Sequence, residues 1–176
     1  PPEFYLYTNL TELDLSYNSF GAISLLDHFP QLKTLRLNCN WTTLQQFHPP
    51  KGLQKLELRS SRIKSLADIH FPNGLEHLQI TSNEIETLAE AQFPDSLRSL
   101  DLRFNRIQSL ADIHFPNGLE QLDLSSNQIE TLAGVQFPDS LRRLDLRSNR
   151  IQSLEGINFP NGLERLDLNS NQIETL

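Results

Sequence analysis

The hydrophobic residues of this chain follow a repeat of nearly constant length, and each repeat begins with a leucine, which we call its opener. The spacing between openers is 22 residues, except for one interval of 21 residues between Leu32 and Leu53. Counting each opener as position 1, leucines at positions 4 and 6 alternate with polar residues, which predicts a short half-buried strand. A period of this length predicts a solenoid whose strands stack into one parallel sheet. The openers are Leu10, Leu32, Leu53, Leu75, Leu97, Leu119, Leu141 and Leu163.

The rest of each repeat supplies further columns of equivalent residues. Isoleucine at position 11 and leucine at position 14, such as Ile129 and Leu132, are expected to point into the core. Phenylalanine at position 19, as in Phe115 and Phe137, is expected to stack beneath the outer wall. The proline after each phenylalanine disfavours a long helix there, so irregular or short 3-10 segments are predicted outside. An asparagine column at position 9, interrupted by Ser61, can satisfy backbone groups where the chain leaves the strand.

The strand motif stands in the chain as LDLRFNRI, LDLSSNQI, LDLRSNRI and LDLNSNQI. It resembles the leucine-rich repeat family over residues 10–176, and the repeat length is similar to that of bacterial internalin-type repeats. The F-P pair before each opener is similar to the L-P of repeats in secreted bacterial effectors. The resemblance implies an α/β fold: a right-handed solenoid of eight coils, bent into a horseshoe arc, with a parallel concave sheet and a mostly irregular convex side.

Two regions are expected along the chain. Residues 1–9 are predicted to form a partial lid over the first coil, with Phe4, Leu6 and Tyr7 as its apolar residues. Residues 10–176 form the array, and its last coil stops before the outer segment. Because solenoids need polar caps to stay soluble, the chain is expected to be a fragment of a longer protein.

Composition narrows the classes of partner. The chain has 15 basic and 22 acidic residues, a net charge of -7, and no concentrated basic stretch, so nucleic acid is not the expected partner. No apolar run approaches the roughly 20 residues that span a bilayer. The single cysteine, Cys39, cannot form an internal disulfide, which favours the cytoplasm or a bacterial effector delivered to a host cell.

No catalytic, cofactor or metal site is predicted. His48 and His70 fall one repeat apart on the outer wall, but zinc normally needs at least three protein ligands. Cys39 has no neighbouring histidine in the sequence to act as a base, and there is no glycine-rich phosphate loop. The repeated acids are paired because the repeats copy them, so the chain is not expected to be an enzyme.

The polar positions beside the strand leucines are expected to form the concave surface. Position 2 alternates between glutamate and arginine from Glu76 to Glu164, which predicts a ladder of ion pairs across the sheet. Position 5 places four aspartates in a row, with arginines on both sides. One interpretation is a solvated face whose charges set register and solubility. The other is an acidic stripe that binds a complementary protein, because like charges side by side do not favour stability.

Exposed aromatic residues are the other candidates for partner contacts, since they supply much of the energy of protein interfaces. Tyr17 and Phe104 fall at position 8, and Trp41 lies just past the strand of the shortened repeat. Trp41 could instead fill the core, in place of the apolar residue missing from its repeat. The predicted partner-binding residues are Tyr17, Arg36, Trp41, Asp101, Phe104, Asp123, Asp145 and Arg147.

The family resemblance implies a protein–protein interaction module that binds another protein through its concave face. Two alternatives remain open at this point. The array could be the sensor or substrate-recruiting arm of a larger enzyme, such as a kinase or a ubiquitin ligase. It could also be a structural spacer whose near-identical repeats carry no specific site.

Overall fold

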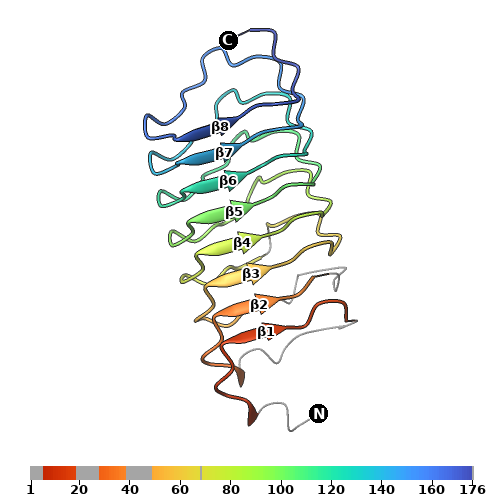
Figure 1. The fold of residues 1–176 in the computed structure, drawn as a ribbon, viewed down its shortest axis with the longest axis vertical. Coiled ribbons are helices and arrows are strands. Elements are labelled where there is room, and N and C mark those ends of the chain that lie inside the picture. The colour runs from red at the N-terminus through yellow and green to blue at the C-terminus, as the bar shows by residue number, and fades with distance from the viewer. Residues whose placement is uncertain (1–5, 19–27, 39–48, 68, 176) are drawn as a thin grey trace.

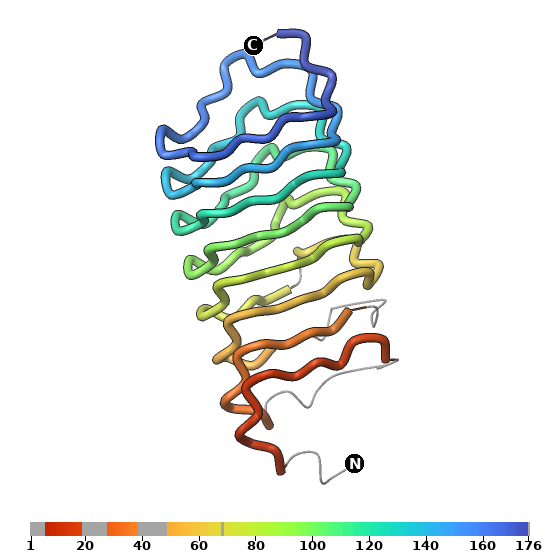
Figure 2. The backbone as a smooth tube through the Cα atoms, viewed as in Figure 1, coloured from red at the N-terminus to blue at the C-terminus, as the bar shows by residue number. Residues whose placement is uncertain are grey.

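The chain forms a single stack of eight short parallel strands, one for each repeat (Figure 1). The computed structural model describes residues 6–18, 28–38, 49–67 and 69–175. Strand order in the sheet follows the sequence, so each coil packs only against the coils before and after it (Figure 2). The strands are β1 (Glu12–Asp14), β2 (Thr34–Arg36), β3 (Lys55–Glu57), β4 (His77–Gln79), β5 (Ser99–Asp101), β6 (Gln121–Asp123), β7 (Arg143–Asp145) and β8 (Arg165–Asp167).

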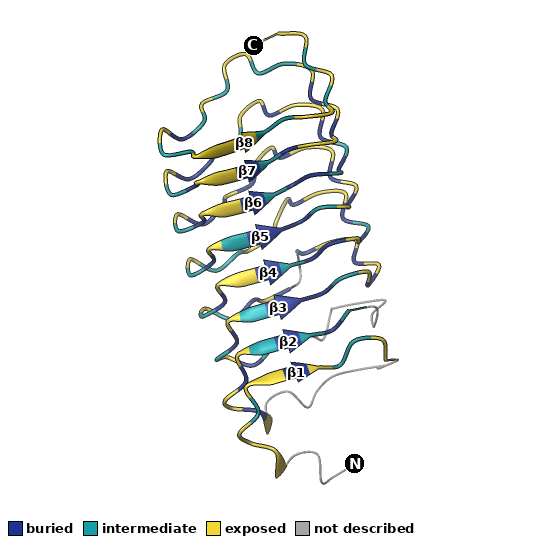
Figure 3. Ribbon diagram, in the orientation of Figure 1, coloured by how far each residue is buried: buried dark blue, intermediate teal, exposed yellow. Residues whose placement is uncertain are grey.

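The strands pair in register, so every position of the repeat becomes a column across the sheet. The central leucine of each strand lies beside its counterparts, as Leu100 does beside Leu122 and Leu122 beside Leu144. These leucines are buried in β1 to β7, whereas the residues beside them, except Glu57 and Asp101, are exposed or half-buried (Figure 3). A side-chain period of two residues therefore separates the core from a polar sheet surface.

The core continues behind the sheet as stacked columns. Ile107, Ile129 and Ile151 at position 11 are fully buried. The phenylalanine rings stack in parallel, with centroids 6.2 Å apart for Phe115 and Phe137, and 5.9 Å for Phe137 and Phe159. The ring spacing exceeds the roughly 4.8 Å between strands, so the outer side of each coil is wider than the sheet side. Both the predicted core columns and the aromatic stack are confirmed.

The asparagine column joins each coil to the one before it. The Asn127 Oδ1 accepts the Ile107 N–H at 3.0 Å, and its amide group donates to the carbonyls of Leu102 at 3.1 Å and Leu124 at 3.0 Å. The predicted role in satisfying backbone groups is therefore confirmed. Ser61, which interrupts the column, is buried and donates to the Leu37 carbonyl at 3.4 Å. The asparagines reach the equivalent carbonyls at 2.7–3.1 Å.

The predicted leucine-rich solenoid is confirmed, with turns and bends in place of helix along the outer side. No α-helix occurs in the described ranges. At the start of the chain, Leu6 and Tyr7 are exposed, and Phe4 lies outside the described residues, so the lid over the first coil stays a prediction. At the other end of the stack, the inward leucine of β8, Leu166, is 37% exposed.

Candidate recognition surface

The side chains at positions 3, 5 and 7 of the eight coils form one continuous polar surface, which we call the sheet face. These positions carry as many basic as acidic residues, although the whole chain has a net charge of -7. The excess negative charge therefore lies on the other sides of the coils. The sheet face is charged but balanced, and its character depends on how the charges pair.

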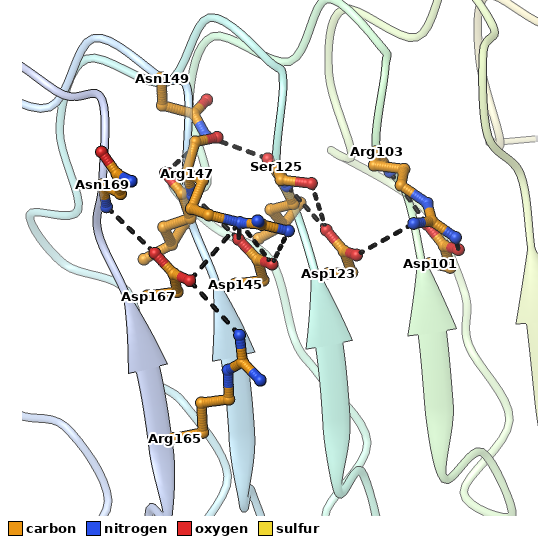
Figure 4. Close-up of polar contacts among 12 residues, drawn as sticks. Asp101, Arg103, Asp123, Ser125, Asp145, Arg147, Asn149, Arg165, Asp167 and Asn169 are labelled. Atoms are coloured by element: carbon orange, nitrogen blue, oxygen red, sulfur yellow. Dashed lines mark hydrogen bonds and ion pairs between the residues drawn. The ribbon is translucent and has the colours of Figure 1, made fainter.

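Between β5 and β8 the pairing takes the form of an Asp–Arg ladder (Figure 4). In-register pairing places Asp101, Asp123, Asp145 and Asp167 side by side at position 5. An arginine at position 7 lies against two of them at a time. Arg103 is 2.9 Å from Asp101 and 4.0 Å from Asp123. Arg147 is 2.8 Å from Asp145 and 3.6 Å from Asp167.

The remaining acceptor atoms of the ladder are also occupied. The Ser125 hydroxyl donates to Asp123 at 2.6 Å, and Arg165 lies 3.5 Å from Asp167. Hydrogen bonding to Asp145 raises the pKa of Arg147 above its usual value. Burial raises the pKa of Asp101, an effect that Arg103 opposes. The row of aspartates predicted from the sequence exists, but the arginines pair with it, so it is a ladder of ion pairs and not a free acidic stripe.

The first half of the sheet face gathers its charge around one carboxylate, Glu57. Its side chain is only 7% exposed and lies 3.3 Å from Arg36, 3.0 Å from Lys55 and 3.5 Å from Arg59. Burial alone would raise the pKa of Glu57, but the three cations outweigh it and hold the pKa below the usual value. Arg36 also reaches Glu12 at 3.6 Å.

Sequence reasoning singled out Arg36 but missed Glu57, Lys55 and Arg59. The position 5 column contains the signal, because Glu57 is the strand neighbour of Arg36 and an acid beside a base in register predicts a cross-strand pair.

The ladder of ion pairs predicted at position 2 forms only in part. Arg98 lies 3.7 Å from Glu120. Arg142, which should have continued the ladder, donates to the carbonyls of Asp139 and Gly162 instead. Among the described residues, the position 2 column contains no second ion pair, and Arg98 itself also donates to the equivalent backbone carbonyl, that of Gly118, at 3.1 Å.

A shallow depression of about 380 Å³ runs across the ladder. Seven charged residues line it: Asp101, Arg103, Asp123, Arg143, Asp145, Arg147 and Arg165. Of these, Arg143 is exposed and forms no ion pair with any residue that the structure describes. The depression therefore combines a fixed pattern of paired charges with one cation still available for an external anion.

Two exposed aromatic side chains stand at the edge of the sheet face. Tyr17 is 82% exposed and Phe104 is 56% exposed. Both line a groove of about 320 Å³ that also contains Arg59 and Arg103. Trp41, the third aromatic residue predicted to bind a partner, lies outside the described residues. The structure thus brings Tyr17 and Phe104 to one groove, and Asp101, Asp123, Asp145 and Arg147 to one ladder.

Other kinds of site find little support in the described part of the chain. No three histidine, cysteine, aspartate or glutamate side chains there gather closely enough to hold a metal ion. The same ranges contain no helix that could cross a bilayer.

Comparisons with known proteins agree with this architecture. The family model described as "Leucine rich repeat" matches residues 95–139, and that described as "Leucine Rich repeats (2 copies)" matches residues 8–47 and 139–176. Internalin C2 from Listeria monocytogenes is similar in structure, with a TM-score of 0.79 and 22% identity over 93% of this chain and 73% of that one. No curated protein sequence matches the chain.

Two further solved structures share the fold. A leucine-rich repeat protein of Leptospira interrogans has a TM-score of 0.64 and 23% identity, over 99% of this chain and 56% of that one. TLR13, solved in complex with ssRNA13, has a TM-score of 0.72 and 25% identity, over 92% of this chain and 26% of that one. The chain thus spans about half of the Leptospira protein and about a quarter of TLR13. At these identities the likeness concerns the fold.

Proposed function

The chain belongs to the leucine-rich repeat family, and on that premise we propose that it is a recognition module that binds a partner protein through the sheet face. The observation that supports this best is the Asp–Arg ladder. Its charged side chains are held by mutual ion pairs and hydrogen bonds before any partner arrives. A preorganised surface loses little side-chain freedom on binding, which lowers the cost of association.

The proposed contacts fall into two groups. Asp101, Asp123, Asp145 and Arg147 lie on the ladder, where they would set orientation through complementary charge. The other group is Tyr17, Phe104 and Arg36, together with Trp41 as a sequence-based prediction. Aromatic side chains and arginine are the residue types that most often dominate binding energy. The ladder would therefore give specificity, and the aromatic residues would give affinity.

A binding role suits the chemistry of the site better than catalysis. Asp101 is buried beside Arg103, and Asp145 lies against Arg147 in an open depression. General acid or base catalysis needs a carboxyl group within reach of a bound substrate, with its pKa near the working pH. The leucine-rich repeat structures that this chain resembles are typical binding modules.

A protein is a better partner for this face than nucleic acid. TLR13 was solved with ssRNA13, so the fold alone does not decide the class of ligand. Affinity for a phosphate backbone comes from several uncompensated cations. On the sheet face, Arg103 and Arg147 are each held between two aspartates, which would repel phosphates. A partner with charges of both signs matches the ladder more closely.

The test exchanges charges without changing the net charge of the protein. The double variant Asp123→Lys/Arg143→Glu reverses the pattern of the sheet face. Its matched control, Glu130→Lys/Arg150→Glu, makes the same exchange at exposed residues on the other side of the coil. Crosslinking capture from cells of the source organism, with quantitative mass spectrometry, should find proteins bound by the wild type and the control but lost from the sheet-face variant. Identical captured sets for all three would disprove the proposal.

A further inference from the structure

Position 8 of the repeat has the same backbone conformation in the seven coils where the structure describes it; Cys39, at this position in the second coil, lies outside the described residues. In these seven coils the residue follows the strand and lies in the left-handed region, with φ between 51° at Ser60 and 58° at Tyr17 and Ser170. Serine fills this position in five of the described coils, whereas Tyr17 and Phe104 fill it in two. Bulky side chains are rare in this region. Ser82 and Ser126, on either side of Phe104, have φ values of 57° and 55°, so the turn itself does not need an aromatic residue.

Tyr17 and Phe104 lie at the two ends of the groove of about 320 Å³, which we call the trough. Tyr17 belongs to the first coil and Phe104 to the fifth, and Ser60 and Ser82 lie between them on the floor. At about 4.8 Å per strand, the four intervening steps separate the aromatic residues by about 19 Å. An extended segment of about six residues covers that length. The trough therefore has the shape for a short extended peptide lying across the strands.

The charged groups that line the trough are both arginines, Arg59 and Arg103. The Nη2 of Arg59 donates to the Gln79 Oε1 at 2.6 Å, but its Nε–H is buried and has no acceptor within the described structure. A buried donor without an acceptor is unfavourable. If the Arg59 guanidinium turned toward the trough, a carboxylate there could accept from Nε and Nη2 together. The trough thus favours a ligand that carries carboxylates between apolar ends.

We propose that the trough between Tyr17 and Phe104 binds an extended acidic segment of the partner protein, with apolar side chains against the two aromatic rings and carboxylates against Arg59 and Arg103. The inference rests on the proposed function, because the segment would belong to the recognised protein. Single-stranded nucleic acid also stacks on aromatic residues beside arginine. It is the weaker candidate because affinity for a phosphate backbone comes from several cations, whereas two arginines are the charged residues among the described lining of the trough.

The experiment selects ligands from a displayed library of random heptapeptides, using the whole 176-residue chain as bait. The dissociation constants of the enriched peptides are then measured by fluorescence polarisation. We expect sequences with apolar residues at both ends and aspartate or glutamate between them. Phe104→Ser and Tyr17→Ser should each weaken binding about tenfold or more, as expected for an interface anchor. Arg59→Gln should weaken it less and reduce its dependence on salt.

The control variant has the amino-acid composition of the wild type, but its phenylalanine is moved from residue 104 to residue 148. The double variant Phe104→Ser/Ser148→Phe carries the same residues, but its phenylalanine stands outside the trough, in a column where the backbone has the same conformation. It should bind as weakly as Phe104→Ser. Thermal unfolding should place Phe104→Ser at or above the wild type, since serine is the ordinary residue of the column. If Phe104→Ser is less stable than the wild type, the dissociation constants of Arg59→Gln and Tyr17→Ser decide whether the trough binds the peptides.

Several outcomes would overturn the proposal. Peptides that bind the relocated variant as well as the wild type would show general hydrophobic adhesion. If the enriched peptides carry no aspartate or glutamate, Arg59 and Arg103 do not bind carboxylates of the ligand, and the proposal is wrong. A labelled ten-nucleotide poly-uridine that binds the wild type and is lost in Phe104→Ser would identify nucleic acid as the ligand. The proposed function can survive any failure of peptide binding, because the charge exchange tests the ladder at Asp123 and Arg143, which are not among the described residues that line the trough.

Discussion

The two halves of the sheet share one backbone but place their charges differently. In the first half, position 5 changes sign between neighbouring strands, from Asp14 to Arg36 to Glu57, so adjacent side chains attract each other. In the second half, position 5 is aspartate in every strand from β5 to β8, so adjacent side chains repel. Compensation there comes from position 7, where an arginine in every second coil lies against two aspartates.

In the second half of the sequence, FPNGLE and FPDSLR alternate at successive openers, so the chain repeats every 44 residues. The difference in charge placement gives this 44-residue repeat a physical meaning. Arg103 serves Asp101 and Asp123, and Arg147 serves the next two aspartates. One arginine thus contacts the aspartates of two coils, and a unit of two coils carries this pairing with it when it is copied. The first half does not follow that alternation, and it contains the features that occur once, such as Glu57 with its three cations and Tyr17.

The largest expected loss of stability comes from placing serine at position 9 of a copied coil, where the third coil has Ser61. Asn127→Ser removes the acceptor for the buried Ile107 N–H and weakens the bonds to Leu102 and Leu124. Unsatisfied buried backbone groups of this kind should lower the free energy of unfolding by about 2–3 kcal/mol. Urea denaturation followed by circular dichroism measures the change.

The matched control is Asn117→Ser, the same substitution at an exposed position on the outer side of the coil. It should change the free energy of unfolding by less than about 0.5 kcal/mol. If Asn127→Ser is equally mild, the asparagine column does not hold the copied coils together, and Ser61 is no weak point in comparison.

The charge centre of the first half gives the next largest effect. Glu57→Gln leaves Arg36, Lys55 and Arg59 without their common carboxylate. Because the cations remain partly exposed and screened, we expect a loss of about 1–2 kcal/mol at neutral pH. A lowered folded-state pKa means that the ionised carboxyl group stabilises the fold above its ordinary value of 4.5, and that this contribution disappears as pH falls through the lowered pKa. The difference between wild type and variant should therefore shrink in acid.

The exposed Glu130→Gln serves as the control for this measurement. Its stability should follow the wild type at every pH. A Glu57→Gln variant whose deficit stays constant down to acidic pH would show that packing, and not charge, accounts for the loss.

A smaller loss of stability is expected at the turn before each opener, where the residue at position 2 of one coil meets the glycine or serine before the next opener. Arg142 donates to the Gly162 carbonyl at 3.1 Å, and a Cβ at Gly162 would collide with the Arg142 guanidinium. In the alternate coil, Glu120 accompanies Ser140, whose hydroxyl donates to the Leu119 carbonyl at 2.6 Å. Gly162→Ser displaces a flexible side chain, so it should cost only about 0.5–1 kcal/mol.

A double-mutant cycle separates a coupled pair from two independent positions. Adding Arg142→Glu to Gly162→Ser converts the turn to the alternate type and should recover most of the loss. The unfolding free energies of the two single variants and the double variant give the coupling energy. Simple additivity of the two changes would mean that arginine and glycine occur together only because the unit was copied.

Sequence reasoning went furthest where one residue type repeats in register. Periodicity predicts the contacts of the inward leucines, the asparagine column and the phenylalanine stack. In each of these columns the same residue type occupies the same position of successive coils, and its side chain reaches few alternative partners. Arginine contacts were harder to predict because the long side chain reaches several acceptors. Arg98 and Arg142 both donate to the backbone carbonyl of the turn before the next opener, but Arg98 also contacts the predicted Glu120, whereas Arg142 donates to the Asp139 carbonyl. The trough between Tyr17 and Phe104 also escaped prediction, since it depends on coils far apart in sequence.

The smallest effect concerns the most buried carboxyl group of the copied half, and its sign is opposite to that of Glu57. Burial raises the pKa of Asp101 above its ordinary value of 3.8. A raised folded-state pKa means that the protonated form stabilises the fold at low pH, and that this contribution disappears as pH rises through the raised pKa. Asp101→Asn imitates the protonated form, so it should equal the wild type in strong acid and be slightly more stable at neutral pH. Thermal unfolding from pH 3 to pH 7 measures both limits, with the better-solvated Asp139→Asn as the control. If Asp101→Asn proves less stable than the wild type at neutral pH, the ion pair with Arg103 outweighs burial, and the copied aspartates stabilise the sheet as Glu57 does.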